Sequence, residues 1–200
     1  MKPFTTSALT WINPPEYSTV TQGEVVIHTS PDTDFWRGTY YGLEYHNAPA
    51  AVLFSENQFW TLKAKVCFES NVFFDQCGLF IYLDENNWMK SGIEYQSNGF
   101  QQLFSVITNN GFSDWSMANF DRLTQRMYYR LSRRGSDFLL ENSVDGINFD
   151  MMRMFHMFHA KESIQFGFFA SSPGDSSFAA HFSEIEWTEC LWKEHTSSRF

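Results

Sequence analysis

The chain of 200 residues carries a net charge of −9 at pH 7, and aromatic residues make up 18% of it. This acidic balance argues against a nucleic-acid partner, because phosphate binding requires clustered Lys and Arg side chains. No apolar run approaches the roughly 20 residues that a membrane-spanning helix needs, so we expect no membrane partner.

The predicted elements are β-strands that follow one another with short turns. Aromatic and β-branched residues favour strands. In chain order, we expect strands at 23–29, 50–55 and 59–69, two paired strands within 74–96, and further strands at 100–108, 126–134, 138–144, 149–155, 163–171 and 177–188, with loops at 31–42 and 111–120. The strand at 59–69 alternates, and its apolar face, which we expect in the core, consists of Trp60, Leu62, Ala64, Val66 and Phe68. Short turns without βαβ spacing indicate antiparallel sheets.

The strand count predicts an all-β fold, a two-sheet antiparallel jelly-roll sandwich. Its length suits one domain over residues 1–189, followed by a C-terminal tail at 190–200. One sheet of such a sandwich is able to leave its outer face open to solvent, where a concave surface would suit an elongated ligand. The N-terminus lacks the apolar stretch of a secretory signal, which favours a cytoplasmic protein.

The segment 74–96 carries the most informative pattern. Residues two apart on a strand point to the same side. Apolar residues therefore alternate on one face of the pair, and the second strand presents a different set on its other face: Trp88, Lys90, Gly92 and Glu94. An indole, an ammonium and a carboxylate in one row indicate a surface for a sugar or another polar ligand.

Several segments together resemble a known family. They are TDFWRGTYYG (33–42), FDQCGLFIYLDENNWMKSGIE (74–94), FSVIT (104–108), SDWS (113–116), YRLSRRG (129–135), NSVDGINF (142–149) and GFFASSPGDSSFAAHFSEI (167–185). The chain resembles domain-of-unknown-function family 1349, often labelled "regulation of enolase" after a fungal member. The resemblance implies a concanavalin-A-like jelly roll, a fold that hosts sugar binders, hydrolases and structural domains alike.

The first candidate site is the polar face with the loop that follows it. Its residues are Asp75, Gln76, Trp88, Lys90, Glu94, Asp114 and Trp115. We expect Trp88 or Trp115 to stack on sugar C–H groups, and the polar side chains to hydrogen-bond hydroxyls. The structural alternative is a Lys90–Glu94 ion pair, with Trp88 filling the edge of the sandwich.

The second candidate is the rim formed by Asp34, Trp36 and Arg37 in the loop 31–42. Loops carry function more often than cores do. The structural alternative is a loop pinned by buried aromatic side chains, with Asp34 capping a turn.

Carboxylate pairs raise the possibility of glycoside chemistry. A glycosidase needs two carboxyl groups about 5–9.5 Å apart, and Glu94 with Asp75 or Asp114 is the better pair here. The motif Glu184-Ile-Glu186-Trp-Thr-Glu189 is superficially similar to that of jelly-roll glucanases, but we interpret it as a solvated last strand. We expect no cofactor and no metal, since the six His residues are scattered. The basic cluster around Arg133 is interpreted as a solvated strand end.

The leading hypothesis is a lectin-like protein that binds a carbohydrate or a small polar ligand. One alternative is a glycoside-processing enzyme that uses Glu94 with a neighbouring Asp. Another is a protein-interaction module that regulates a metabolic enzyme, as the family label suggests. The excess of aromatic residues also allows a homodimer through the sheet edges.

Overall fold

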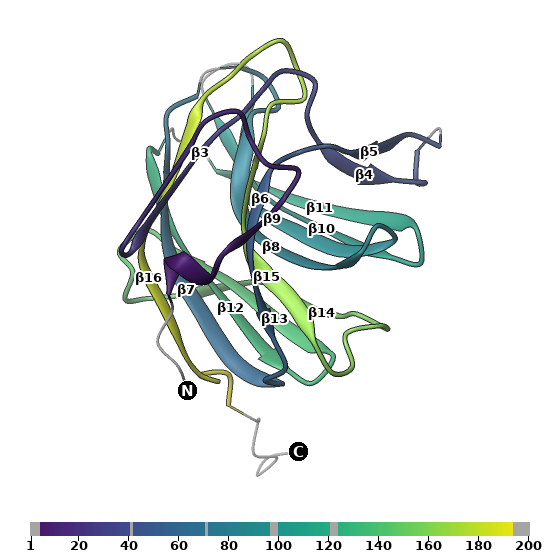
Figure 1. Ribbon diagram of the computed structural model, residues 1–200, viewed down its shortest axis with the longest axis vertical. Helices are drawn as coiled ribbons and strands as arrows, with labels where there is room; N and C mark the ends of the chain where they lie inside the picture. The colour runs from purple at the N-terminus through teal and green to yellow at the C-terminus, as the bar shows by residue number, and fades with distance from the viewer. Residues whose placement is uncertain (1–4, 41, 71, 97–99, 121–123, 194–200) are drawn as a thin grey trace.

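The computed structural model describes residues 5–40, 42–70, 72–96, 100–120 and 124–193. Two seven-stranded antiparallel sheets pack face to face, as Figure 1 shows, which confirms the predicted all-β jelly-roll sandwich. Besides the strands, the described chain contains one 3-10 turn, η1 (Thr6–Ala8).

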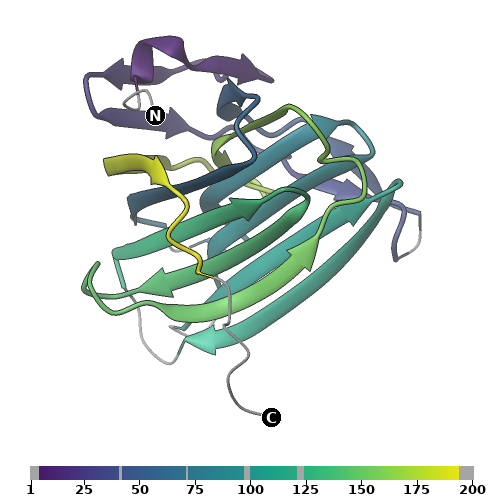
Figure 2. The same ribbon diagram turned by 90° about the horizontal axis from the view of Figure 1, so that it is seen from below.

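The first sheet contains the strands of the candidate site. Its order is β1 (Thr10–Ile12), β6 (Ala50–Ser55), β15 (Ile164–Ser171), β8 (Gln76–Asp84), β9 (Asn87–Tyr95), β10 (Gln101–Asn109) and β11 (Phe112–Phe120). The second sheet runs β14 (Asp150–His156), β13 (Asp137–Ser143), β12 (Arg126–Arg134), β7 (Phe59–Phe68), β16 (Ala179–Glu189), β3 (Glu24–His28) and β2 (Ser18–Thr21). Figure 2 shows β12, β13 and β14 side by side in green.

The main core lies between the two sheets and follows the predicted alternation. Its residues on β7 are Trp60, Leu62, Ala64, Val66 and Phe68, all buried. Trp60 stacks on Phe166 of the first sheet, with ring centroids 4.1 Å apart. Cys77, Leu79 and Ile81 of β8 also face this core, so the predicted apolar face of 74–96 is confirmed.

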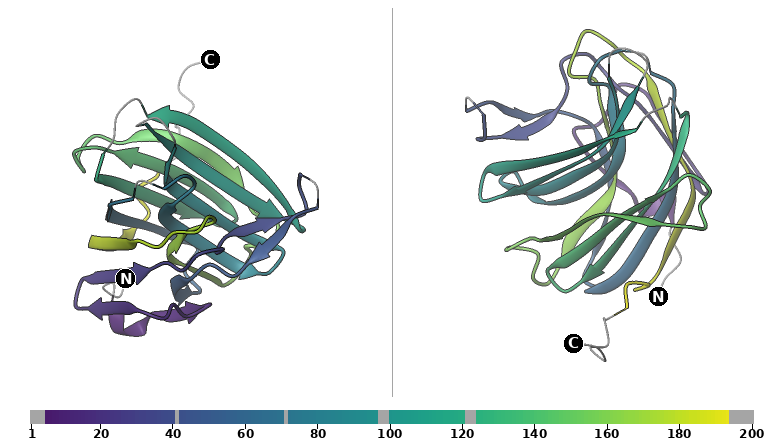
Figure 3. Two further views of the ribbon diagram at one scale, coloured as in Figure 1. Left: turned by 90° about the horizontal axis from the view of Figure 1, so that it is seen from above. Right: turned by 180° about the vertical axis from the view of Figure 1, so that it is seen from behind.

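A hairpin covers part of the first sheet from outside. It consists of β4 (Phe35–Arg37) and β5 (Glu44–His46), and Figure 3 shows it projecting from the body of the sandwich next to the first sheet. Beneath it lies a second apolar cluster on the outer face of the first sheet: Phe35, Ala48, Ala50, Val52, Phe80, Trp88, Phe104, Val106 and Phe169. The sequence predicted an outer face open to solvent, but this part of it is buried because the hairpin covers it.

Two predicted loops are in fact strands. Residues 31–42 include β4, and β11 takes up nearly all of residues 111–120 and pairs with β10 along its whole length. Asn110 and Gly111 both have positive φ, 52° and 80°, as a tight hairpin turn that matches strand twist requires. This turn folds the chain straight back onto β10.

The basic cluster around Arg133 and the start of the predicted C-terminal tail also differ from their predicted description. Arg133 is fully buried, and its guanidinium donates to the carbonyls of Gly135, Asn57 and Ala160 at 2.7–3.1 Å. Arg133 therefore ties loops together, which corrects its interpretation as a solvated strand end. The predicted tail begins with a docked residue, since the Leu191 amide donates to Thr61 Oγ1 at 2.8 Å; residues 194–200 lie outside the described chain.

Candidate functional site

A cavity of about 730 Å³ lies between the hairpin and the outer face of the first sheet. The hairpin side contributes Asp34, Trp36, Tyr40, Leu43 and Tyr45. The sheet side contributes Gln76, Lys90, Glu94, Phe104, Val106 and Trp115. A cavity of this size suits one small ligand.

Strand register explains why the polar residues gather at the floor. Gln76 on β8 lies opposite Glu94 on β9, and Glu94 lies opposite Gln102 on β10. Directly opposed residues of antiparallel strands share a face. A second row, four residues along β9, contains Lys90 beside Phe80 and Val106.

Between these rows, Gly78 lies opposite Gly92. Neither glycine adds a side chain to the floor. A Cβ on Gly92 would lie 1.9 Å from the Cys77 carbonyl oxygen, and one on Gly78 would lie 2.0 Å from that of Ser91. The two backbones approach too closely for any other residue, and they leave a bare strip between the rows.

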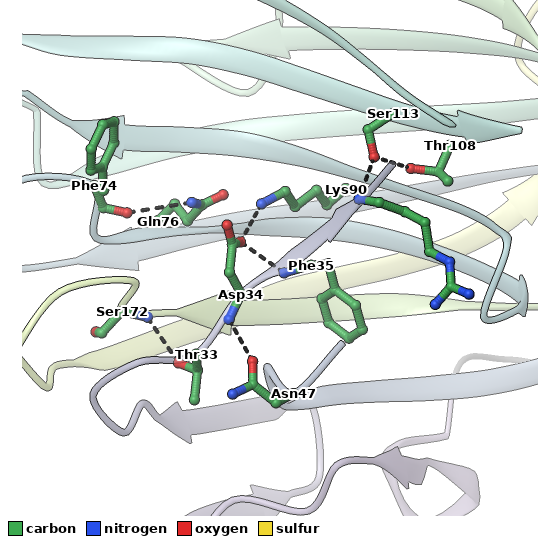
Figure 4. A network of polar contacts seen from close by, with 11 residues as sticks. Thr33, Asp34, Phe35, Asn47, Phe74, Gln76, Lys90, Thr108, Ser113 and Ser172 are labelled. Carbon is green, nitrogen blue, oxygen red and sulfur yellow. Dashed lines mark hydrogen bonds and ion pairs between the residues drawn. The ribbon is translucent and has the colours of Figure 1, made fainter. Parts of the chain in front are cut away.

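Lys90 forms a buried ion pair with Asp34 (Figure 4). The expected Lys90–Glu94 ion pair is not among those of the described residues. The Lys90 side chain is 3% exposed and that of Asp34 is 18% exposed. The same carboxylate oxygen of Asp34 accepts from the Phe35 amide at 2.8 Å. Asp34 therefore fixes the start of β4 onto the sheet, which agrees with a structural role at the base of the hairpin, and it also lines the cavity.

Glu94 is the titratable group at the floor. Burial raises the pKa of its carboxyl to about 7, with a further rise from Asp34 that Lys90 and a hydrogen bond from Gln96 oppose. The Gln96 amide donates to Oε1 of Glu94. A carboxyl of this kind changes its protonation state near neutral pH and marks a candidate functional site.

Two glutamine side chains flank Glu94 with unused acceptors. Nε2 of Gln76 donates to the Phe74 carbonyl at 3.4 Å, and Nε2 of Gln102 donates to Asn119 Oδ1 at 2.8 Å. The Oε1 atoms of both amides are buried and have no partner in the described part of the chain. Sequence reasoning found Gln76 but missed Gln102, which only the pairing of β9 with β10 reveals.

Aromatic side chains form the walls of the cavity. Trp36 and Trp115 meet edge to face, with ring centroids 6.2 Å apart. Trp115 is 43% exposed, so part of its ring is free to stack on a ligand. The sequence indicated both tryptophans as site residues, but it gave no signal for Tyr40 and Tyr45. These tyrosines line the cavity only because the hairpin folds over the sheet.

Trp88 does not belong to the binding surface. Its indole is fully buried beneath the hairpin, with ring centroids 5.6 Å from Phe35 and 6.4 Å from Phe80. The prediction that it offers a stacking platform is therefore wrong. The alternative of Trp88 as a packing residue is the correct one, and the reason is the cover that β4 provides.

The carboxylates of two other predicted residues are bound to side chains away from the floor. The Asp75 carboxylate is 1% exposed and accepts from the hydroxyls of Ser70 and Ser176. Asp114 lines the cavity margin, but its carboxylate accepts from Arg153 of the second sheet at 2.6 Å. The structure thus does not pair Glu94 with either Asp side chain.

Arg37 also lies outside the cavity lining. Its guanidinium is 3.9 Å from the carboxylates of both Glu44 and Glu85, and its amide donates to Ser113 Oγ at 3.0 Å. Arg37 therefore holds the hairpin against the β10–β11 turn region and does not form a binding rim.

Other candidate chemistry finds little support in the described residues. Glu184 and Glu186 form surface ion pairs with Lys65 and Lys63 at 2.9 and 2.7 Å. The residues described include no group of three or more His, Cys, Asp or Glu side chains placed to hold a metal ion.

Among the described helical segments, none has the length and apolar character needed to cross a membrane.

Known proteins are similar to this chain in sequence and in fold. The chain is 29% identical over 184 residues to "Regulation of enolase protein 1" of Saccharomyces cerevisiae, covering 92% of this chain and 91% of that protein. A solved structure of a functionally unknown protein from Saccharomyces cerevisiae has a TM-score of 0.87 at 28% identity, over 94% of this chain and 100% of that chain.

A GH43 protein from Bacillus licheniformis has a TM-score of 0.73 at 15% identity, over 94% of this chain and 38% of that chain. At this identity the likeness concerns the fold alone. The family model described as "Protein of unknown function (DUF1349)" matches residues 11–190. Because that match spans most of the chain, the chain belongs to this family.

Proposed function

We propose that the chain is a lectin-like protein that binds a carbohydrate or a related small polar ligand in the cavity beneath the β4–β5 hairpin. The observation that carries the proposal is the joint presence of buried, unpartnered acceptors on the floor and a partly exposed Trp115 on the wall. Buried polar atoms without partners cost free energy unless a ligand or water satisfies them.

The chemistry of the walls and the floor supports a sugar-like ligand. Aromatic rings stack on the C–H faces of pyranose rings, and carboxylate and amide oxygens accept hydrogen bonds from hydroxyl groups. The cavity brings Trp36 and Trp115 close to Glu94 and Gln76. A ligand with one apolar face and several hydroxyl groups would use both kinds of surface at once.

Titration with a panel of glycans and sugar phosphates, measured by calorimetry or ligand-observed NMR, tests the proposal. Trp115→Ala should weaken binding of any ligand found by about tenfold, which corresponds to roughly 1.4 kcal/mol. Phe54→Ala is the matched control. Phe54 is 61% exposed on β6, the same sheet, and it does not line the cavity.

The proposal fails if nothing on the panel binds. It also fails if Trp115→Ala and Phe54→Ala bind as the unmodified protein does, because the ligand would then sit elsewhere.

A second candidate is a protein-interaction module that regulates a metabolic enzyme, which the name of the yeast relative suggests. Exposed apolar side chains at the hairpin favour it: Leu43 is 41% exposed and Phe112, close to Gly38, is 66% exposed. Size-exclusion chromatography of the chain mixed with enolase distinguishes the two functions. Co-elution that Phe112→Ser abolishes would support the module, and separate elution would remove enolase as its partner.

A glycoside-processing enzyme has less support. Glu94 has the raised pKa that a general acid needs, but neither Asp75 nor Asp114 is available as its partner, since each is bound to other side chains.

A further inference from the structure

The floor of the cavity carries an excess of hydrogen-bond acceptors. Gln76, Glu94 and Gln102 form one row across three neighbouring strands, and they are 3%, 3% and 8% exposed. Gln76 and Glu94 line the cavity, and Gln102 lies next to Glu94 outside the lining. The Oε1 atoms of both amides lack donors in the described chain. The carboxyl of Glu94 receives a hydrogen bond from Gln96 at Oε1. The two members of this row that line the cavity, Gln76 and Glu94, are complemented by hydrogen-bond donors on a ligand.

Three donors that line the cavity are already engaged. The Lys90 ammonium pairs with Asp34, and the Trp36 indole N–H donates to the Thr39 carbonyl at 2.5 Å. The Ser113 hydroxyl bonds with Thr108 Oγ1 at 2.8 Å. Because Lys90 and Asp34 neutralise each other, an ionised Glu94 leaves the floor with a net negative charge.

We propose that the cavity selects a ligand with a protonated primary amine on a hydroxylated ring or chain, as in an amino sugar, and that the ammonium binds between Glu94 and Gln76. This inference rests on the proposed function and names its ligand class. An ammonium has three N–H donors and no acceptor, which complements the acceptor row. Charge-assisted hydrogen bonds are about twice as strong as neutral ones.

The aromatic walls suit the same ligand. A cation near the face of a Trp or Tyr ring is attracted by the ring quadrupole, and Trp36, Tyr45 and Trp115 line the same cavity as Glu94. The hydroxylated remainder of the ligand would stack on these rings, as in the proposed function.

The protonation of Glu94 gives a second, independent readout. Burial keeps the pKa of this carboxyl at about 7 in the free protein, so binding of a cation must remove a proton from it at lower pH. The groups that face Glu94 are Lys90 on its own strand, Asp34 before β4, Gln76 on β8, Gln102 on β10, and Gln96 just beyond β9. With this pKa, about a tenth of the Glu94 carboxyl groups are ionised at pH 6 and about half at pH 7. Because the ammonium binds the ionised form, the affinity for the amine should rise about fivefold from pH 6 to pH 7.

Pairs of ligands that differ only by an amine test the inference directly. The probes are glucosamine with glucose, galactosamine with galactose, and chitosan oligosaccharides with cello-oligosaccharides, each titrated at pH 6 and pH 7 by calorimetry. We expect the amine of at least one pair to bind about tenfold more tightly at pH 7 than its hydroxyl counterpart. The amine should also show the pH-dependent gain, with proton release at pH 6.

Two variants test whether the preference for the amine depends on Glu94 itself or on the overall negative charge of the protein. Glu94→Gln, with folding checked by its thermal midpoint, should reduce the preference for the amine to near onefold. Glu186→Gln removes one negative charge from the outer face of the second sheet, where Glu186 pairs with Lys63, and should leave the preference unchanged.

Equal binding of amines and neutral sugars overturns the inference and leaves the proposed function standing. A preference that Glu94→Gln retains also overturns it. Absence of binding by every probe would overturn the proposed function itself, and the inference with it.

Discussion

Replacement of Trp88 by Ala separates packing from ligand binding most clearly. The Trp88 side chain is fully buried in the cluster beneath the hairpin. A buried Trp removes about 150–250 Å² from water, which at about 25 cal/mol per Å² corresponds to roughly 4–6 kcal/mol. The indole N–H of Trp88 has no partner within the described residues, so its removal returns part of that free energy.

The net destabilisation for Trp88→Ala should therefore be about 3–4 kcal/mol, near the usual range for a buried aromatic residue. For a chain of this length, the thermal midpoint should fall by roughly 6–16 °C. Differential scanning calorimetry measures this shift. Trp115→Ala is the control, since Trp115 is 43% exposed, and its midpoint should change by about 2 °C or less. Equal midpoints for the two variants would refute the placement of Trp88 beneath the hairpin.

Three further predictions concern the floor of the cavity. Gly92→Ala should destabilise the protein and lower its yield of folded chain, because a Cβ there would lie 1.9 Å from the Cys77 carbonyl oxygen; a crystal structure of a stable Gly92→Ala variant with unmoved strands would contradict this. Lys90→Met should cost up to about 3–5 kcal/mol in urea unfolding by leaving the Asp34 carboxylate unpaired, and Asp34→Asn in the same chain should restore part of the loss. Finally, the raised pKa of Glu94, about 7, means that the folded state binds a proton that the unfolded state releases between about pH 4.5 and 7. Stability should fall as pH rises through this window, by at most about 1.4 kcal/mol per pH unit, and Glu94→Gln should show a shallower slope in urea unfolding at pH 5, 6, 7 and 8.

The sequence was sufficient for the local pattern of the strands. Alternation along β7 predicted Trp60 and Leu62 in the core, and both are buried there. The same rule placed Lys90 and Glu94 on one face of β9, which the register confirms. These predictions succeeded because a strand side chain needs only its neighbours two residues away to define its face.

The cover over that face could not be predicted, because it depends on a contact between distant parts of the chain. Lys90 meets Asp34 across 56 residues of sequence. Nothing in the local pattern of residues 31–42 shows that their hairpin folds over β9. Because the sequence does not reveal this contact, it predicted Trp88 as an exposed stacking platform. For the same reason, the burial of Glu94 could not be predicted.

The prediction of a loop at β11 was wrong for a different reason. The Asn110–Gly111 pair is a strong hairpin signal, yet the Ser, Asp and Asn residues that follow are poor strand formers and favoured a loop. Pairing with β10 overrides that preference. The same pairing logic, applied from β9 to β10, would have found Gln102 beside Glu94.

The indole N–H signals of the seven tryptophans offer the most direct measurement of ligand binding beneath the hairpin. In a ¹H–¹⁵N NMR titration with the tightest ligand of the sugar panel, the signals of Trp36 and Trp115 should shift with a common dissociation constant. The signal of Trp60, buried between the sheets, should stay in place. Shifts confined to other tryptophans, with Trp36 and Trp115 unmoved at saturating ligand, would contradict a binding site in this cavity.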